Sequence, residues 1–333
     1  MNPDSTASTN TSAREAWNFA GVAVRLCATW LLVGALFKLF KANPGDLPKP
    51  FVALSPFGLV TTFVLAISVE LVVVAFAYLR PKLGWIPLVL TFVFFEILLA
   101  QLIASGAKSC GCMGGAVTIA PALMATIDGT LLLLVIAAQP WKHTPKPNFG
   151  FVATALVALA CAAYPWFQLH AELAYDANQS NPAPVAGTPT TGEPAPSPRF
   201  IVIHPDKWVG KSIFEVNELT VHMEPGDADK LPTDGYVVLW RQSCEHCRDH
   251  LREMANDKTK NDGSKPIVLV QIQDDLKNAP AVDAMPQGPH VTKLALRPGP
   301  EFAIQTPWEI VVEGGMVTAA LDEEHAKALQ QKQ

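Results

Sequence analysis

Charged residues are scarce in this sequence and unevenly distributed. Asp, Glu, Lys and Arg make up 17% of the 333 residues, whereas hydrophobic residues make up 50%. An average soluble domain has about 25% charged residues, so the composition argues against a wholly soluble protein. Residues 1–170 hold 10 Lys/Arg against 6 Asp/Glu, and the rest of the chain holds 15 against 24. The acidic second half would repel phosphate backbones, so no nucleic-acid partner is expected.

Cysteine is also scarce, and six residues are too few for a disulfide framework. Two of them lie within apolar runs, where we expect small core residues. The other four form two close pairs, which suggests redox chemistry or metal binding. The isolated cysteines are Cys27 and Cys161, and the pairs are Cys110/Cys112 and Cys244/Cys247.

A typical cleaved signal peptide is missing, because no small-residue cleavage site follows a short apolar core. Residues 1–15 are polar and are expected to be disordered. Five apolar stretches of about 20 residues follow, each long enough to cross a bilayer as a helix. We expect Pro81 and Pro87 to mark the second connection and Pro140 and Pro145 the fourth. The predicted spans cover roughly 17–40, 57–79, 84–106, 116–138 and 149–169.

The number of spans constrains which cysteines share a compartment. With five spans, the loop after the third lies on the same side as the C-terminal tail, so both cysteine pairs face one compartment. A cytoplasmic N-terminus gives five basic residues inside and four outside, a weak positive-inside bias. Disulfide chemistry belongs outside the cytosol, which favours the same orientation in a bacterial inner membrane. The inner set is Arg14, Arg80, Lys82, Lys142 and Lys146, and the outer set is Lys38, Lys41, Lys49 and Lys108.

A proline-rich segment, 178–199, separates the spans from the tail. Its six prolines favour extended structure that could reach on the order of 60 Å, either as a passive spacer or as a tether that lets the tail move. After it, residues 236–241 resemble a buried strand, and a helical pattern runs from the cysteine pair to about residue 256.

This order places Cys244 at a helix N-terminus, where unpaired N–H groups and the helix dipole stabilise a thiolate. Cys247 lies one turn later and can resolve a mixed disulfide. An imidazolium at His246 would further favour the thiolate, which makes the disulfide a better oxidant. A static disulfide or a zinc site is the alternative. Zinc would need a second pair in the same domain, although His246 and His250 are near.

Two further predicted strands, 266–272 and 308–313, lead to a turn at Gly314–Gly315 and a last strand, 316–321. Residues 275–290 are expected to form a loop. Thr306–Pro307 precedes a strand. On these features, residues 200–333 resemble a thioredoxin-like domain, and the resemblance implies a cis bond at Pro307 in a loop that faces the dithiol. The sequence departs from that family in having Ser243 before the pair and Glu-His within it.

The other pair lies in the segment Ser109-Cys110-Gly111-Cys112-Met113-Gly114-Gly115. A disulfide between Cys110 and Cys112 would close a small, strained ring of the labile, oxidising kind. Each cysteine could instead pair elsewhere or bind a soft metal such as copper.

Residues 20–140 resemble the MauE/DoxX family of membrane proteins. The resemblance rests on CGCMGG after the third span, on Arg25, on Gly34 through Lys38, and on Glu70-Leu71. It implies a four-helix membrane domain, here 16–140, with a fifth span at 149–170 as an addition. The family is associated with methylamine utilisation, where such a protein assists maturation of a disulfide-rich dehydrogenase.

Four ionisable residues fall within the spans: Arg25, Glu70, Glu96 and Asp128. Such groups are costly in a membrane and face a partner or a cavity. We expect either an Arg25–Glu70 ion pair that fixes helix packing, or a polar pocket for a quinone or a proton near the loop cysteines.

The sequence therefore predicts a membrane helix bundle followed by an α/β thioredoxin-like domain. The first hypothesis for function is a thiol–disulfide oxidoreductase that acts on client proteins outside the cytosol. In it, Cys244/Cys247 and Cys110/Cys112 exchange disulfides, assisted by His246, Thr306 and Pro307, and dithiol exchange itself requires no cofactor. The alternatives are soft-metal transfer by the four paired cysteines and a non-catalytic assembly factor.

Overall fold

A computed structural model describes most of both halves of the chain. The described residues are 5–107, 110, 119–143, 150–170, 173, 200–273, 282, 284–298 and 301–322; the side chains of 5–18, 143 and 245 are outside the description. The chain divides into two compact units, Met1–Pro198 and Arg199–Gln333. The predicted linker, 178–199, lies outside the described residues.

In the described part of the first unit, five helices are long and apolar enough to cross a membrane, which confirms the predicted spans and indicates an integral membrane protein. Short elements connect them: η1 (Pro44–Asp46) and α2 (Lys49–Leu54) follow the first helix, and α6 (Pro140–His143) follows the fourth. The long helices are α1 (Ser5–Lys41), α3 (Leu59–Leu79), α4 (Pro81–Ala104), α5 (Pro121–Ala138) and α7 (Phe151–Gln168).

Two details of the predicted spans were wrong. Helix α1 begins at Ser5, so it includes residues 5–15 that we expected to be disordered; this stretch contains the good helix formers Ala, Arg and Glu. Pro87 does not end a connection but lies inside α4. Proline is tolerated in membrane helices where neighbouring groups satisfy the backbone. The start of the fourth span, 116–118, lies outside the described residues.

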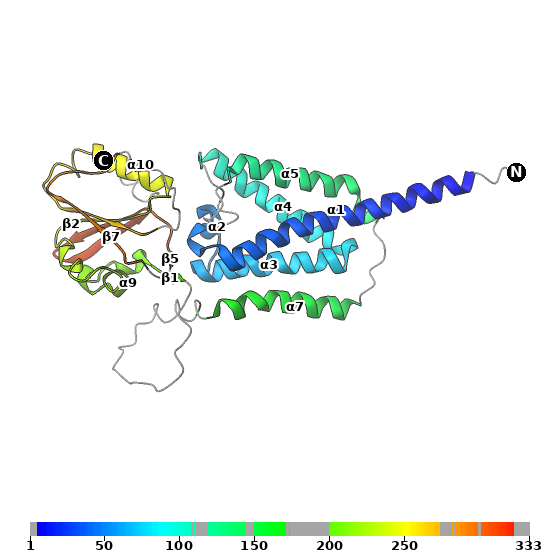
Figure 1. Ribbon diagram of the computed structural model, residues 1–333, viewed down its shortest axis with the longest axis horizontal. Coiled ribbons are helices and arrows are strands. Elements are labelled where there is room, and N and C mark those ends of the chain that lie inside the picture. Colours follow the sequence, from blue (N-terminus) through cyan, green and yellow to red (C-terminus); the bar gives the residue numbers. More distant parts are fainter. Residues whose placement is uncertain are drawn as a thin grey trace, which may run out of the picture. The chain divides into compact units, whose positions relative to one another are not determined.

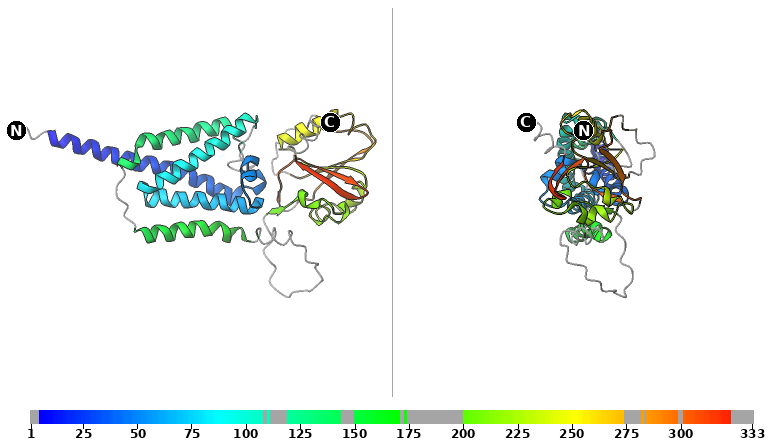
Figure 2. Two further views of the ribbon diagram at one scale, coloured as in Figure 1. Left: turned by 180° about the vertical axis from the view of Figure 1, so that it is seen from behind. Right: turned by 90° about the vertical axis from the view of Figure 1, so that its left-hand side faces the viewer.

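Helices α1, α3, α4 and α5 share one apolar core, and α7 packs against α3 (Figure 1). At the α3–α4 turn the two helices approach closely, because a Cβ on Gly84 would lie 2.4 Å from the Phe76 carbonyl carbon. Figures 1 and 2 show α2, the C-terminal end of α4, the N-terminal end of α5 and the C-terminal end of α7 at one end of the bundle. The core residues are Val24, Cys27, Ala28, Leu31, Val73, Val74, Ala77, Leu88, Phe92 and Val135.

The second unit is an α/β unit built on a five-stranded sheet of order β4-β3-β2-β6-β7. Strands β2, β3 and β4 are parallel, whereas β6 is antiparallel to both β2 and β7. Helix α10 (Glu245–Asn256) connects β2 to β3. The strands are β2 (Gly235–Trp240), β3 (Ile267–Gln271), β4 (Val291–Ala295), β6 (Trp308–Glu313) and β7 (Met316–Asp322).

The four strands and the helix expected from the sequence are confirmed, but three strands were missed. Strands β1 (Phe200–Val202) and β5 (Glu301–Ala303) have three residues each and pair only with one another. Strand β4 has the sequence VTKLA and is mostly half-buried. It was missed because it contains no continuous apolar run. The predicted loop is described only at 282 and 284–290, where it has no helix or strand.

The two faces of the sheet are covered by different parts of the chain. Figure 1 shows α10 on one side and α9 (Asn217–Thr220) on the other. Side chains of α10, led by Leu251 and Met254, pack on one face. The segment around α9 buries Trp208, Ile213 and Leu219 completely or nearly so. Its short helices are η2 (Pro205–Trp208), η3 (Ile213–Glu215) and η4 (Ala228–Lys230).

Candidate functional site

Cys244 is the N-cap residue of α10, as the sequence predicted. Its backbone is extended, and its Sγ accepts a hydrogen bond from the Cys247 N–H at 3.0 Å. A disulfide joins Cys244 and Cys247. The first turn of a helix has N–H groups without intrahelical acceptors, so this position stabilises negative charge on the Cys244 sulfur when the disulfide opens.

The two sulfurs differ in their access to solvent. Cys247 is completely buried, in the cluster under α10 that also contains Val238 and Leu251, whereas Cys244 is only partly buried. An incoming thiolate can therefore reach Cys244 and not Cys247. In a thiol exchange, this asymmetry would make Cys244 the attacked sulfur and Cys247 the resolving one.

A loop 62 residues later in the sequence lies against Cys244. The Thr306–Pro307 peptide bond is cis, and the Thr306 carbonyl oxygen is 3.5 Å from the Cys244 Sγ. The sheet explains this proximity. Strand β6 begins at Trp308 and pairs with Leu239 near the end of β2, so the residues before β6 meet those after β2.

His246 lies in the first turn of α10, between the two cysteines, and is partly exposed. The side chain of its neighbour Glu245 is outside the description. The structure thus brings together the five candidate residues that the sequence assigned to this site: Cys244, His246, Cys247, Thr306 and Pro307.

A buried charged cluster, which the sequence did not reveal, connects α10 to β6. Glu309 is 2% exposed, and its Oε2 lies 3.3 Å from Nε2 of the buried His250. Its Oε1 accepts a hydrogen bond from the Lys260 Nζ at 2.5 Å. Burial raises the pKa of Glu309, but the contacts with His250 and Lys260 outweigh burial and leave that pKa below its usual value.

This cluster lies close in the sequence to the residues of the cysteine site. His250 is one helical turn after Cys247, and Glu309 is two residues after Pro307. The composition of β6 is the signal that could have revealed it, because Glu309 precedes Ile310 in a strand whose interior positions are otherwise apolar. A carboxylate there needs a partner.

In the membrane unit, Cys110 is 2% exposed and its N–H donates to the Ile119 carbonyl at 3.0 Å. It packs with Leu99 and Leu102 of α4 and with Met124 of α5. Cys112 lies outside the described residues, so the predicted Cys110/Cys112 pair stays a prediction. Cys27 is buried, as expected for a core residue, whereas Cys161 is only partly buried.

The predicted Arg25–Glu70 ion pair was wrong. Glu70 of α3 pairs with Lys38 of α1, and Arg25 is exposed on the outside of α1. Arg25 precedes Lys38 by 13 residues, which at 3.6 residues per turn places the two about 220° apart around the helix. From the sequence, Lys38 was counted among the outer charges and as part of the Gly34–Lys38 resemblance, and not as a partner of Glu70.

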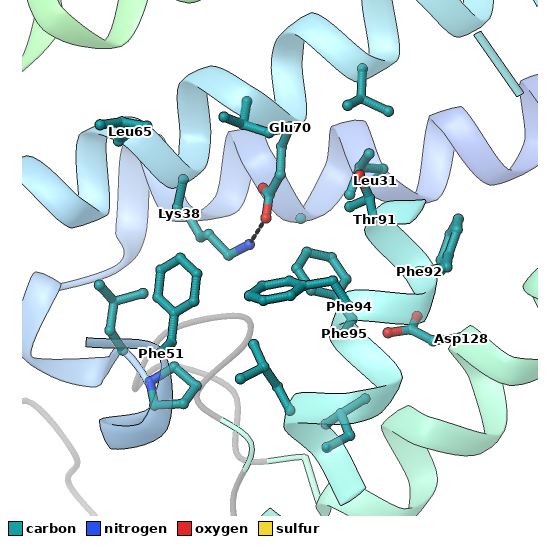
Figure 3. Close-up of a pocket in the computed structure, with 18 of the residues that line it drawn as sticks. Leu31, Lys38, Phe51, Leu65, Glu70, Thr91, Phe92, Phe94, Phe95 and Asp128 are labelled. Atoms are coloured by element: carbon teal, nitrogen blue, oxygen red, sulfur yellow. Dashed lines mark hydrogen bonds and ion pairs between the residues drawn. The ribbon is translucent and has the colours of Figure 1, made fainter. Parts of the chain in front are cut away.

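A cavity of about 640 Å³, which we call the membrane cavity, lies among α1 to α5 (Figure 3). Glu70 and Asp128 line it together with Lys38, and the remaining wall is almost entirely apolar. The Asp128 Oδ1 accepts a hydrogen bond from the Trp30 Nε1 at 2.9 Å. Of the four residues from which a polar pocket was predicted, Glu70 and Asp128 line this cavity, whereas Arg25 and Glu96 do not.

Among the residues that the structure describes, no three His, Cys, Asp or Glu side chains form a group that could hold a metal ion. Comparison with protein-family models, with curated proteins and with solved structures finds no match to this chain.

Proposed function

We propose that the protein is a membrane-anchored thiol–disulfide oxidoreductase whose Cys244/Cys247 site exchanges disulfides with client proteins outside the cytosol. The observation that carries the proposal is the asymmetry of this disulfide. A partly exposed sulfur at a helix N-terminus is paired with a fully buried one, beside the loop of Thr306 and Pro307.

The reaction follows from this asymmetry. A client thiolate attacks the Cys244 Sγ, forms a mixed disulfide and releases Cys247 as a thiolate, which takes up a proton. A second client thiolate then attacks the client sulfur of the mixed disulfide and releases Cys244. The client loses two electrons and two protons, and the Cys244/Cys247 pair gains them. The Cys247 N–H and the dipole of α10 stabilise the Cys244 thiolate that leaves.

We also propose a thioredoxin-like fold for the second unit. The sheet order β3-β2-β6-β7, with α10 between β2 and β3 and an antiparallel β6–β7 hairpin, supports it. The edge strand β4 follows β3 in the sequence and is an addition to this arrangement. For the first unit, the proposed relationship to the MauE/DoxX family rests on the sequence motif alone.

We propose that Cys110 and Cys112 form a second dithiol that exchanges disulfides with Cys244 and Cys247 and so gives the site a route for electrons. The support is the number of spans, because a chain that crosses the membrane five times has the loop after the third span and the C-terminal tail on the same side. The orientation gains support from Lys38, which lies in α1 and pairs with Glu70. Without Lys38, the outer side has three basic residues and the inner side has five.

Trapping the mixed disulfide tests the proposed function. In the Cys247→Ala variant the Cys244 thiolate can attack a disulfide of a client or of the Cys110/Cys112 loop, and the second sulfur of that disulfide leaves as a thiolate. No neighbouring thiol can then displace the partner from Cys244, so Cys244-linked complexes should accumulate in intact membranes. Non-reducing gels and mass spectrometry of linked peptides would identify them. The Cys244→Ala variant is the matched control and should trap nothing. If Cys247→Ala accumulates no mixed disulfide with a client or with the loop, the proposal fails.

Replacing both cysteines tests the alternative of a non-catalytic assembly factor. A protein that only docks a client keeps its function in a Cys244→Ser/Cys247→Ser variant, whereas a dithiol oxidoreductase loses it. The redox state of client cysteines, measured by alkylation in membranes, distinguishes the two outcomes.

A further inference from the structure

The membrane cavity has the form of a ligand site. Its volume of about 640 Å³ lies within the range of about 300–1,000 Å³ that is typical of small-molecule pockets. Aromatic side chains form much of the wall, and Phe51 of α2 makes an edge contact with Phe94 of α4 at a centroid distance of 5.8 Å. Faces and edges of this kind suit a flat ring.

The cavity also contains a buried acceptor without a donor. Glu70 is 3% exposed, its Oε1 accepts from Lys38, and its Oε2 has no hydrogen-bond partner among the described residues. Figure 3 shows the Lys38 and Glu70 side chains reaching toward each other beside Phe95. A buried carboxylate oxygen without a donor is costly, so this site favours a ligand that supplies a hydroxyl.

The charges exclude an anionic ligand. Two carboxylates, Glu70 and Asp128, face the cavity against one ammonium, that of Lys38. The head group of an anionic phospholipid would therefore meet net repulsion. A neutral group that both accepts from an ammonium and donates to a carboxylate fits better.

The outer wall of the cavity reaches the surface that faces lipid. Val69 of α3 and Leu90 and Phe94 of α4 line the cavity and are 49%, 63% and 37% exposed. In a bilayer these side chains contact acyl chains, so a ligand can enter sideways from the hydrocarbon. This route selects a lipid-soluble molecule.

We propose that the membrane cavity binds a quinone, with its ring among the aromatic side chains and its oxygens at Lys38 and Glu70. The quinone form accepts a hydrogen bond from the Lys38 ammonium. The quinol form also donates one to the Glu70 Oε2. The isoprenoid tail leaves between α3 and α4.

The redox role of this ligand rests on the proposed function. Closing a disulfide between Cys110 and Cys112 releases two electrons and two protons, which convert one quinone to one quinol. Cys110 packs against Leu99, Leu102 and Met124, and all three also line the cavity. The quinone would thus be the oxidant that restores the disulfides after each client is oxidised.

Binding of a short-chain benzoquinone with one isoprene unit to the detergent-solubilised full-length protein tests the proposal. The protein is kept oxidised, so no electrons pass and the affinity is measured apart from thiol chemistry. Gly34 lines the cavity and has open space where a Cβ would be, so Gly34→Leu is chosen to add bulk at the cavity wall. Gly21→Leu, on the same helix, has equal space but lies outside the cavity.

We expect saturable binding that Gly34→Leu weakens by about tenfold or more and that Gly21→Leu changes by less than about twofold. Glu70→Gln should weaken the binding of quinol more than that of quinone, whereas Glu96→Gln should change the binding of neither. Absence of saturable binding, or equal binding by Gly34→Leu, overturns the proposal. Phospholipid that copurifies with wild type but not with Gly34→Leu, without quinone binding, also overturns it. Quinone binding without client trapping by Cys247→Ala would refute only the proposed function.

Discussion

Lys38 of α1 and Glu70 of α3 form an ion pair in the interior of the membrane unit, with side-chain exposures of 12% and 4%. The Lys38 ammonium also lies 5.5 Å from the centre of the Phe95 ring of α4. The pair therefore fixes α1 and α3 relative to each other while contacting a third helix.

Breaking this pair should destabilise the membrane unit more than removing it altogether. Lys38→Met leaves an uncompensated buried carboxylate and should cost about 3 kcal/mol in the free energy of unfolding. The double variant Lys38→Met/Glu70→Gln should recover most of that loss. Thermal unfolding in detergent measures both. Arg25→Met is the control, and coupling between Arg25 and Glu70 in the same cycle would contradict the structure.

Gly84 should be required for the close approach of α3 and α4. A Cβ there would lie 2.4 Å from the Phe76 carbonyl oxygen, and a backbone cannot move aside as a side chain does. We expect Gly84→Ala to lower stability by about 1–3 kcal/mol. Gly21→Ala, which meets open space, should be neutral or stabilising in the same detergent melts. Equal melting temperatures for the two variants would contradict the close approach of α3 and α4.

Spans, the strand–dithiol–helix order and the cis bond at Pro307 were all predictable from the sequence. The spans and the strand–dithiol–helix order depend on local information: a run of about 20 apolar residues, and a buried strand before a cysteine pair. The cis bond rested on the resemblance to a thioredoxin-like domain, because a proline before a strand is by itself rarely cis. The partner of Glu70 was not predictable, because it depends on which faces of two helices meet. Periodicity marks an apolar helix as buried without saying which side of it faces a given neighbour.

The same limit applies to the second unit. Lys260 and His250 are polar residues far from Glu309 in the sequence, and their contacts with it follow only from how α10 and the segment after it pack on the sheet, so the Glu309 cluster emerged only with the fold. Strands β1 and β5 are too short for any periodic signal and exist because they pair with each other. The two cysteines of the cysteine site, by contrast, are three residues apart in the sequence, and only Thr306 depends on the sheet for its place beside them.

His246 should raise the reduction potential of the Cys244/Cys247 disulfide. A positive charge in the first turn of α10 stabilises the Cys244 thiolate and hence the reduced form. His246→Gln should make the potential more reducing by about 30 mV, which is a tenfold change in the equilibrium constant. His246→Lys, which retains the charge, should restore it. Equilibration with glutathione buffers at pH 6 measures the difference, and a potential unchanged by Gln would refute the role.

Glu309 should stabilise the second unit in a pH-dependent way. Its pKa is lowered in the folded protein, so its ionised form contributes stability above the ordinary value of 4.5 and loses it as the pH falls through the folded pKa. Glu309→Gln should cost about 2 kcal/mol or more near pH 7 and progressively less below pH 4.5. Pulse proteolysis across this pH range measures the loss.

The matched control is Glu313→Gln on the same strand, whose side chain is 57% exposed and whose nearest ion-pair contact, with Lys265, is 4.0 Å long. It should change stability by less than about 0.5 kcal/mol at any pH. A Glu309→Gln penalty that persists unchanged at acid pH would show that the carboxylate acts by shape and not by charge.

The entry of the chain into the second unit has a mechanical consequence. Strand β1 begins at Phe200 and pairs in parallel with β5, and Ile203 continues the contact by donating to the Ala303 carbonyl. Strand β5 ends three residues before Thr306. Tension on the chain ahead of Phe200 is therefore borne first by these few hydrogen bonds, and it reaches the loop beside Cys244 before it loads the five-stranded sheet.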